Sequence, residues 1–161
     1  MKIRACVPDD AEQIVQIYNL FIQNSTATFE EDSLSAEVMA ERITTISQDY
    51  PFLIGEQNNQ IIGYAYASRW KERSAYRYTA ETTVYVKQNS QGNGLGRALY
   101  QKLFEELKSR GFHCGLAGIT LPNEASVKFH ESLGFEKVGQ LKDVGFKFGR
   151  WIDVGYWEIV F

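Results

Sequence analysis

The chain has 161 residues, of which 44% are hydrophobic and 23% charged, and its formal net charge is −3. This composition is typical of an ordinary globular protein that can bury a core. The chain has no long basic run, no apolar run near the roughly 20 residues of a membrane span, and no signal-peptide pattern at its start. We therefore predict one cytoplasmic domain over residues 1–161, with no nucleic-acid or membrane partner.

The two cysteines, Cys6 and Cys114, lack CxxC spacing. Two cysteines without this spacing argue against a zinc site or a disulfide framework and favour buried free thiols. Neither cysteine stands in a sequence context that would activate it as a nucleophile.

The first half of the chain predicts a strand, two helices and a hairpin. Residues 2–7 form a short strand, and Asp9 and Asp10 are candidate N-caps of a helix. A loop over 25–33 precedes a second helix over 35–48. The tight turn of the hairpin is predicted at Asn58-Asn59, since Asn tolerates positive φ. The apolar positions of the first helix are Ala11, Ile14, Val15, Tyr18, Phe21 and Ile22, and the second helix has Val38, Arg42, Ile43 and Ile46 along one side.

The second half alternates strand and helix. Residues 78–87 are rich in Thr, Tyr and Val and predict a strand. A leucine every fourth residue then predicts an amphipathic helix that stops at Gly111. A strand over 114–121, a helix from Asn123 to about Leu133 and two final strands complete the order β-α-α-β-β-β-α-β-α-β-β. This order predicts a mixed sheet with helices on its faces.

Three glycines at alternate positions, Gly92, Gly94 and Gly96, stand directly before the leucine-rich helix. Glycine lets backbone N–H groups turn toward one point, and the start of a helix adds unpaired N–H groups and partial positive charge. We therefore predict an anion-binding loop in which Gln91 and Arg97 hold the loop or the ligand. The alternative is a loop that only joins a strand to a helix.

The spacing of these glycines differs from the two familiar nucleotide loops. A dinucleotide-binding motif needs GxGxxG early in a βαβ unit, and a P-loop needs GxxxxGK followed by Ser or Thr. This chain has GxGxG late in the sequence. A nucleotide-binding protein is thereby disfavoured.

Two motifs resemble a known superfamily. QGNGLG, residues 91–96, is similar to the acetyl-CoA pyrophosphate loop of the GNAT superfamily of N-acetyltransferases, and NEASVKFHESLGF, residues 123–135, is similar to its second cofactor-side motif. Segments along nearly the whole chain, among them NSTATFE and TAETTVYV, also resemble the subfamily of phosphinothricin and methionine sulfoximine N-acetyltransferases.

The resemblance implies an α/β GNAT fold, with a mixed and mostly antiparallel sheet flanked by helices. It implies acetyl-CoA as co-substrate, no metal, and direct transfer in a ternary complex to the α-amino group of a small amino-acid analogue. Methionine sulfoximine, methionine sulfone and phosphinothricin are the implied acceptors. It also implies a homodimer, to which the aromatic C-terminal region with Trp151 and Trp157 would contribute core or interface.

Glu81 is the predicted general base. It lies in a strand otherwise made of Thr, Tyr, Ala and Val, where glutamate is disfavoured, and it aligns with the glutamate of the subfamily's TAES motif. An ammonium must lose a proton before it attacks a thioester, and burial would raise the carboxyl pKa toward a useful range. The alternative is a glutamate on the solvent face of an edge strand.

His130 has two interpretations. Many superfamily members carry a tyrosine here that protonates the departing thiolate, whereas the phosphinothricin acetyltransferases carry histidine. His130 is therefore predicted to protonate the sulfur or to relay a proton. The alternative is a core histidine that is hydrogen-bonded in place.

The predicted cofactor-binding residues come from a strand, the glycine loop and the start of the last helix. The strand is expected to offer its backbone groups. The two helix residues lie three apart and can face one way, although plain helix capping is the alternative for Asn123. The set is Val84, Tyr85, Val86, Gln91, Gly92, Asn93, Gly94, Leu95, Gly96, Arg97, Asn123 and Ser126.

Acceptor recognition is assigned to a cationic loop and one aromatic residue. The stretch RWKERSAY, residues 69–76, offers cations for a carboxylate or phosphinate, and it matches the subfamily pattern. A solvated charge cluster is the alternative. Lys147 also matches the subfamily, without an assigned role. The predicted set is Phe29, Arg69, Lys71, Arg73 and Tyr76.

Other acceptors and one other class of function stay open. An ordinary amino acid, a polyamine or a protein N-terminus would keep the fold and change the acceptor, and the basic loop argues against polyamines. A CoA-binding module without turnover is the alternative from another class, for which Glu81 would be dispensable.

Overall fold

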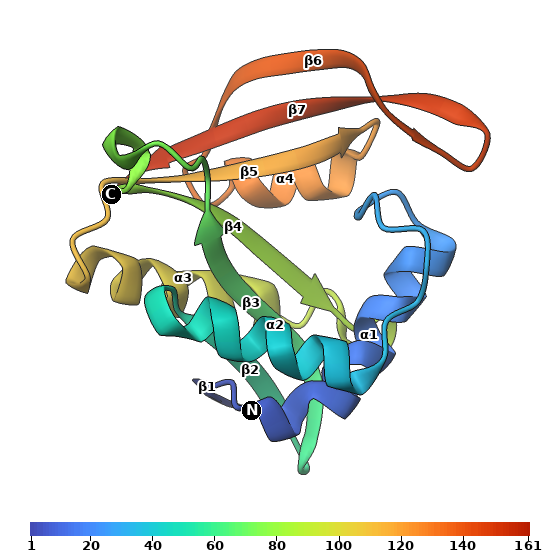
Figure 1. Ribbon diagram of the computed structural model, residues 1–161, viewed down its shortest axis with the longest axis vertical. Coiled ribbons are helices and arrows are strands. Elements are labelled where there is room, and N and C mark those ends of the chain that lie inside the picture. The colour runs from blue at the N-terminus through green and yellow to red at the C-terminus, as the bar shows by residue number, and fades with distance from the viewer.

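Seven strands form one twisted sheet that carries helices on both faces, in a computed structural model that describes residues 1–161 (Figure 1). The sheet order is β1-β2-β3-β4-β5-β7-β6, and every neighbouring pair is antiparallel except β4 and β5. The strands are β1 Lys2–Ala5, β2 Phe52–Gln57, β3 Gln60–Arg69, β4 Thr79–Val86, β5 Cys114–Leu121, β6 Glu136–Lys147 and β7 Arg150–Val160. The predicted mixed, mostly antiparallel sheet is confirmed.

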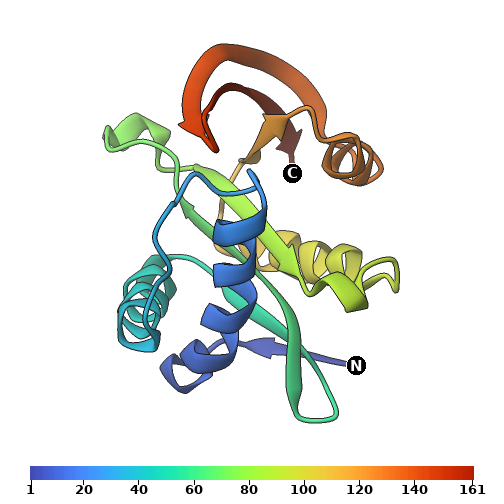
Figure 2. The ribbon, with the colours of Figure 1, turned by 90° about the vertical axis from the view of Figure 1, so that its right-hand side faces the viewer.

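The helices divide between the two faces. Figure 2 shows α1 and α2 on one side of the sheet and α3 and α4 on the other. The helices are α1 Ala11–Asn24, α2 Ala36–Asp49, α3 Leu95–Ser109 and α4 Glu124–Glu131, and three 3₁₀ turns are η1 Pro8–Asp10, η2 Ser74–Tyr76 and η3 Gln88–Ser90. The order of strands and helices is the one that the sequence predicts. No helix has both the length and the apolar character that a membrane span requires.

Each face of the sheet has its own buried cluster. The α3 side is filled by the predicted leucine stripe of Leu95, Leu99, Leu103 and Leu107, each at most 1% exposed. The α1 and α2 side is filled by aliphatic residues of both helices and by Phe52 of β2, whose ring stacks on those of Tyr64 and Tyr66 of β3. Both cysteines are buried free thiols, as predicted.

Two details of the helices differ from the sequence prediction. Val38 does not face the core and is 41% exposed, because Met39 and Ile43 are the residues that α2 turns toward the sheet. Asp10 stands at the start of α1 but does not cap it with its side chain. Its carboxylate instead accepts hydrogen bonds from the Arg4 guanidinium and the Val7 amide. The pair with Arg4 connects the start of the helix to β1.

The turns follow the predicted chemistry. Asn58 and Asn59 both have positive φ, 52° and 61°, and close the β2–β3 hairpin. Gly111 has φ +84° just after α3, and the Phe112 amide reaches back to the Leu107 carbonyl. These are left-handed positions that favour Asn or Gly.

The separation of β4 from β5 is the feature of the sheet that creates space for a site. The two strands pair only at Thr79–Glu81 with Cys114–Leu116. Beyond that point β4 stays on β3 as far as Val86, and β5 stays on β7 as far as Leu121. Figure 1 shows the two strands diverging toward the glycine loop and α4.

We expect Gly111→Ala to lower the free energy of unfolding by about 1–2 kcal/mol, because alanine is strained at positive φ although nothing lies within 4 Å of the new Cβ. Gly139→Ala is the matched control, since its Cβ also meets nothing and its φ is not positive. Urea unfolding measures both variants. Equal midpoints would contradict a role for backbone strain.

Candidate active site

A cavity of about 730 Å³ opens where β4 and β5 diverge. Its lining comes from α1 and the loop after it, from β3, β4 and β5, from the glycine loop, and from α3 and α4. All the predicted cofactor-binding residues line it, together with Glu81 and His130. The structure thus brings residues 81–97 and 123–130 to one space.

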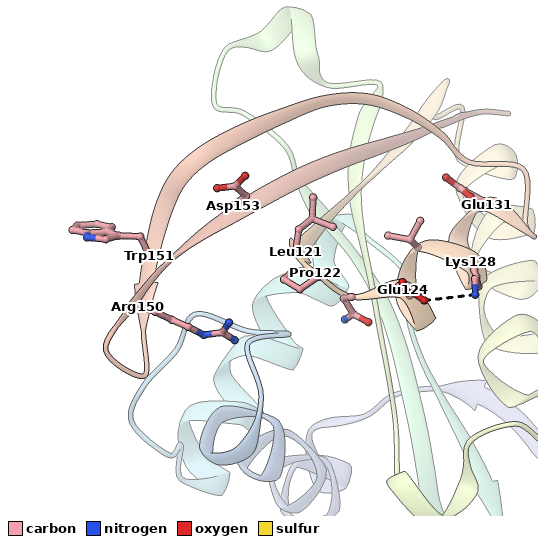
Figure 3. A pocket seen from close by; sticks show the side chains of 10 residues that line it. Leu121, Pro122, Glu124, Lys128, Glu131, Arg150, Trp151 and Asp153 are labelled. Carbon is pink, nitrogen blue, oxygen red and sulfur yellow. Dashed lines mark ion pairs between the residues drawn. The ribbon is translucent and has the colours of Figure 1, made fainter.

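A second cavity, of about 560 Å³, lies between the start of α4 and β7 (Figure 3). Three of its charged side chains have local partners: Lys128 pairs with Glu124 on the surface of α4, and Asp153 accepts hydrogen bonds from Gln140 and the Asp143 amide. It holds neither Glu81 nor His130. The larger cavity, which contains both predicted catalytic residues, is therefore the candidate active site.

The glycine loop is open toward the larger cavity. Gly92 and Gly94 have φ of +78° and +85°, and a Cβ at either would meet nothing within 4 Å. The amides of Gly96 and Arg97 lie in the first turn of α3 and donate to no acceptor within the chain. With the partial positive charge of the helix start, these amides suit a phosphate.

Polar side chains fix the shape of this loop. Asn93 Oδ1 accepts the Leu95 amide at 3.1 Å, and Gln91 Nε2 donates to the Val86 carbonyl at 3.4 Å. The Arg97 guanidinium donates to the Ser132 hydroxyl at 2.8 Å and so links the start of α3 to the end of α4. Gln91 therefore holds the loop, and Arg97 holds the two helices together.

Close packing brings α3 against α4 beside the loop. A Cβ at Gly96 would stand 3.2 Å from the Phe129 ring. Glycine at this position therefore serves the approach of the two helices, whereas the first two glycines serve the turn.

The free edge of β4 faces the gap. The Lys87 amide bonds to the Ile62 carbonyl of β3, and backbone groups alternate along a strand. Val84 and Val86 therefore present their backbone groups to the gap, and Tyr85 presents its groups to β3. The Thr82 hydroxyl donates to the Leu116 carbonyl at 3.3 Å, which satisfies that group where the strands begin to part.

Glu81 stands where the strands begin to separate. Burial raises the pKa of its carboxyl, and no ion pair or hydrogen bond offsets that effect. A Cβ at Gly118 of β5 would stand 3.7 Å from Glu81 Oε1, so glycine keeps the space beside the carboxylate open. A half-buried carboxylate without a partner is costly, which makes Glu81 a functional candidate.

His130 is 5% exposed and engaged at both ring nitrogens. Nδ1 lies 2.8 Å from the Ser126 carbonyl oxygen, which can only accept, and Nε2 lies 3.2 Å from the Tyr100 hydroxyl. The ring is then neutral, and burial lowers its pKa. This arrangement favours a histidine held in place over one with a proton free for a leaving group.

Asn123 caps α4 and lines the cavity at once. Its Oδ1 accepts the Ser126 amide at 3.1 Å, which confirms the capping alternative. Ser126 lies one turn from His130 on the same helix and also faces the cavity.

The far end of the cavity is lined by α1 and the loop that follows it. The Tyr18 hydroxyl lies 2.8 Å from the Thr28 hydroxyl, and the Tyr85 hydroxyl donates to the Ala27 carbonyl at 3.4 Å. Aromatic rings and hydroxyls make this end polar without a cation. The lining residues that sequence reasoning missed are Tyr18, Phe21, Ala27, Thr28, Tyr66, Thr82, Thr83, Ser90, Tyr100, Ala117, Gly118, Ile119, Thr120, Ala125 and Phe129.

No sequence signal marks most of these missed residues. Tyr100 shares the buried face of α3 with the leucines and looks like core from its spacing alone. Thr82 follows Glu81 in a strand where threonine is common. Only the packing of distant elements turns these side chains into the wall of one cavity.

None of the five predicted acceptor-binding residues lines the cavity. Arg69 pairs with Glu72 on the exposed loop after β3, and Lys71 lies over the ring of Trp70. Tyr76 is 41% exposed, and Arg73 immediately precedes η2. Phe29 lies beyond the cavity wall, with its ring against Gly145.

The base of this cationic loop still adjoins Glu81. The Trp70 ring meets the Tyr156 ring edge-on at 5.2 Å. The Cβ position of Gly118 lies 3.4 Å from the Tyr156 ring and 3.7 Å from the Glu81 carboxylate. Tyr156 and Glu81 therefore lie on either side of Gly118, and Arg69 at the base of the loop pairs with Ala80 beside Glu81.

We expect Glu81→Gln to raise the Tm at pH 7.5. The folded-state pKa of Glu81 lies above its unfolded value, so stability is full below the unfolded pKa and is lost as pH rises through the folded pKa. Glutamine removes this loss, and its advantage should shrink toward pH 4. Thermal unfolding at both pH values measures the difference, and an equal Tm at pH 7.5 would contradict a costly carboxylate.

Comparisons with known proteins identify the family of the chain. Residues 3–155 match the family model described as an acetyltransferase (GNAT) domain. The chain is 37% identical to a phosphinothricin N-acetyltransferase of Streptomyces viridochromogenes, over 98% of this chain and 86% of that one. It is also 37% identical to an L-methionine sulfoximine/L-methionine sulfone acetyltransferase of Salmonella typhimurium, over 99% and 94%.

A solved structure shares the fold over almost the full length. The crystal structure of a GNAT superfamily phosphinothricin acetyltransferase from Sinorhizobium meliloti in complex with AcCoA has a TM-score of 0.94 and 35% identity, covering 99% of this chain and 87% of that one. The family match spans nearly all of the sheet and both motifs around the cavity. The chain therefore belongs to the GNAT acetyltransferase family.

Proposed function

We propose that the protein is an acetyl-CoA-dependent N-acetyltransferase for the α-amino group of a small amino-acid analogue. Methionine sulfone, methionine sulfoximine and phosphinothricin are the proposed acceptors, in line with the names of its relatives. The observation that carries the proposal is one cavity that joins an open glycine loop with free amides to the half-buried Glu81 carboxylate, which has no hydrogen-bond or ion-pair partner.

The residues fit acetyl-CoA along the cavity. The amides of Gly96 and Arg97 would bind its pyrophosphate, since their glycine loop is open and their N–H groups are free. The backbone groups of Val84 and Val86 would bind the pantetheine arm along the free edge of β4. Asn123 and Ser126 would face the same arm from α4. Acetyl-CoA supplies the activated acetyl group as a thioester.

Glu81 would take the proton that the acceptor ammonium must lose. Burial raises its pKa and makes it a stronger base than an exposed glutamate. The neutral amine would then attack the thioester carbonyl directly. Neither cysteine lines the cavity, which supports direct transfer over an acyl-enzyme.

His130 and Glu81 lie on opposite faces of the sheet. Thr82 bonds to Tyr100 and so faces the α3 side of the sheet, where His130 also lies. Side chains alternate along a strand, so Glu81, the residue before Thr82, faces the α1 side. The amine would approach from the α1 side and the sulfur would leave toward α4. In this proposal His130 holds Tyr100 and Ser126 in place beside the sulfur. A proton reaches the thiolate through one of these hydroxyl groups, and His130 does not donate it directly.

The acceptor carboxylate needs a cation from outside the cavity. Arg97 is the one lysine or arginine in the lining, and it stands at the glycine-loop end. Arg69, Lys71 and Arg73 are the proposed source, because their loop adjoins Glu81 through Trp70 and Tyr156. Phe29 and Tyr76, which also lie outside the cavity lining, would then contact the part of the acceptor that extends toward this loop.

A panel of amines with acetyl-CoA tests this function through release of the free thiol. We expect turnover of methionine sulfone or sulfoximine, and a loss of about 10²-fold or more in kcat/KM in Glu81→Gln, because a general base contributes that much. Glu105→Gln, an exposed glutamate of α3, is the matched control.

Binding of acetyl-CoA, measured by calorimetry, separates the alternatives. We expect Glu81→Gln to keep the affinity of the parent protein, since Glu81 lies away from the glycine loop. Equal turnover in parent and variant would remove Glu81 as base. Binding without thiol release from any amine would identify a CoA-binding module, and a preference for ordinary amino acids or polyamines would change the acceptor.

We also propose that the protein is a homodimer through the β6–β7 hairpin. Phe146 and Trp151 form an exposed pair with ring centroids 4.9 Å apart, 53% and 65% exposed. Val144 and Phe148 extend this apolar face, and β6 is an edge strand. Trp157, in contrast, is 2% exposed and belongs to the core.

We expect light scattering to give a mass near twice the 18.4 kDa of one chain. Replacing Phe146 and Trp151 together by serine should give the monomer mass, because the apolar face is lost. A parent protein that is monomeric at micromolar concentration would contradict the proposal.

A further inference from the structure

Lys147, at the end of β6, is a buried lysine that holds a distant loop. It is 1% exposed, and its Nζ donates to the Ser25 carbonyl at 2.9 Å and to the Thr28 carbonyl at 2.8 Å. Burial lowers its pKa, which the carboxylates of Glu31 and Glu30 oppose. An ammonium is rarely buried without such partners, so its position and that of the loop depend on each other.

Further contacts fix the same loop, residues 25–30. The Phe29 ring covers Gly145 so closely that a Cβ there would stand 2.2 Å from it. The Thr26 hydroxyl lies 3.2 Å from the Thr120 hydroxyl of β5, and Glu30 accepts two hydrogen bonds from the Arg42 guanidinium of α2. The loop is therefore tied to the following helix α2 and to two strands that are distant in sequence, β5 and β6.

This loop forms the far wall of the cavity. Ala27 and Thr28 line it directly, opposite the glycine loop and on the α1 side that Glu81 faces. Acetyl-CoA would fill the glycine-loop end, so the remaining end between Glu81 and residues 27–28 is the space for the acceptor.

We propose that Lys147 is a positioning residue for the acceptor: by holding the carbonyls of Ser25 and Thr28, it sets the position of the cavity wall and thereby which amine side chain fits beside Glu81. The proposal rests on the proposed function, because it needs an acceptor at this end. Lys147 touches neither substrate and acts through the loop alone.

The alternative is that Lys147 only stabilises the fold. A stabilising residue would affect both substrates alike, or neither. A positioning residue affects the acceptor and leaves acetyl-CoA unchanged, because the glycine loop shares no hydrogen bond with residues 25–30 or Lys147. The split between the two substrates is therefore the decisive measurement.

Lys147→Met removes the donors and keeps most of the side-chain length. We expect it to raise the KM for the acceptor by about tenfold or more, with the Kd for acetyl-CoA within about twofold of the parent. Amides of residues 26–30 should exchange hydrogen faster. Lys102→Met, an exposed lysine of α3, is the matched control.

Thr26→Val tests the same wall if Lys147→Met does not fold. It removes only the Thr120 contact at a half-buried position and should raise the acceptor KM less, in the same direction. Unchanged acceptor KM and hydrogen exchange in the folded variants would overturn the proposal, as would a parallel loss of acetyl-CoA affinity. If the parent turned over no amine, the proposed function would fail, and hydrogen exchange alone would still test the hold of Lys147 on the loop.

Discussion

The early end of pairing between β4 and β5 is the constraint on which the site depends. Backbone N–H and C=O groups normally find partners within a sheet. Here β4 leaves its groups free on one edge after Glu81, and the Thr82 hydroxyl satisfies the first orphaned carbonyl of β5. The sheet thereby supplies an extended row of hydrogen-bonding groups and a cavity together. Helices α3 and α4 close the space from one side, and α1 with its loop closes it from the other.

The cavity combines two sites of opposite electrostatic character. Gly96 and Arg97 offer free amides at the start of a helix, where negative charge is stabilised. Glu81 offers a half-buried carboxylate whose pKa is raised by burial. A carboxylate in this position without a partner lowers stability. That cost, at the point where β4 and β5 separate, is the physical ground for proposing a chemical role for Glu81.

The walls of the cavity are fixed by polar contacts between distant parts of the chain. His130 is bonded through both nitrogens to Ser126 and Tyr100, which makes it part of the wall beside α3. Lys147 does the same for the loop after α1, from the opposite end of the sequence. Buried polar groups of this kind tolerate few alternative arrangements, because each must keep its partners. These contacts therefore set the distance between the two walls of the cavity.

Local sequence rules were enough to predict the order of elements, the open glycine loop and the position of the candidate base. These rules are the period of apolar residues, the need for glycine at positive φ, and the rarity of glutamate in a strand of β-formers such as that of Glu81. They did not predict the exposure of Val38 or the partners of Asp10, because the buried face of a helix is set by what packs against it. The folded structure was needed to show that His130 is bonded at both nitrogens, that the cationic loop lies outside the cavity, and that Lys147 holds the loop after α1. Each of these depends on contacts between residues far apart in the chain, which spacing along the sequence does not encode.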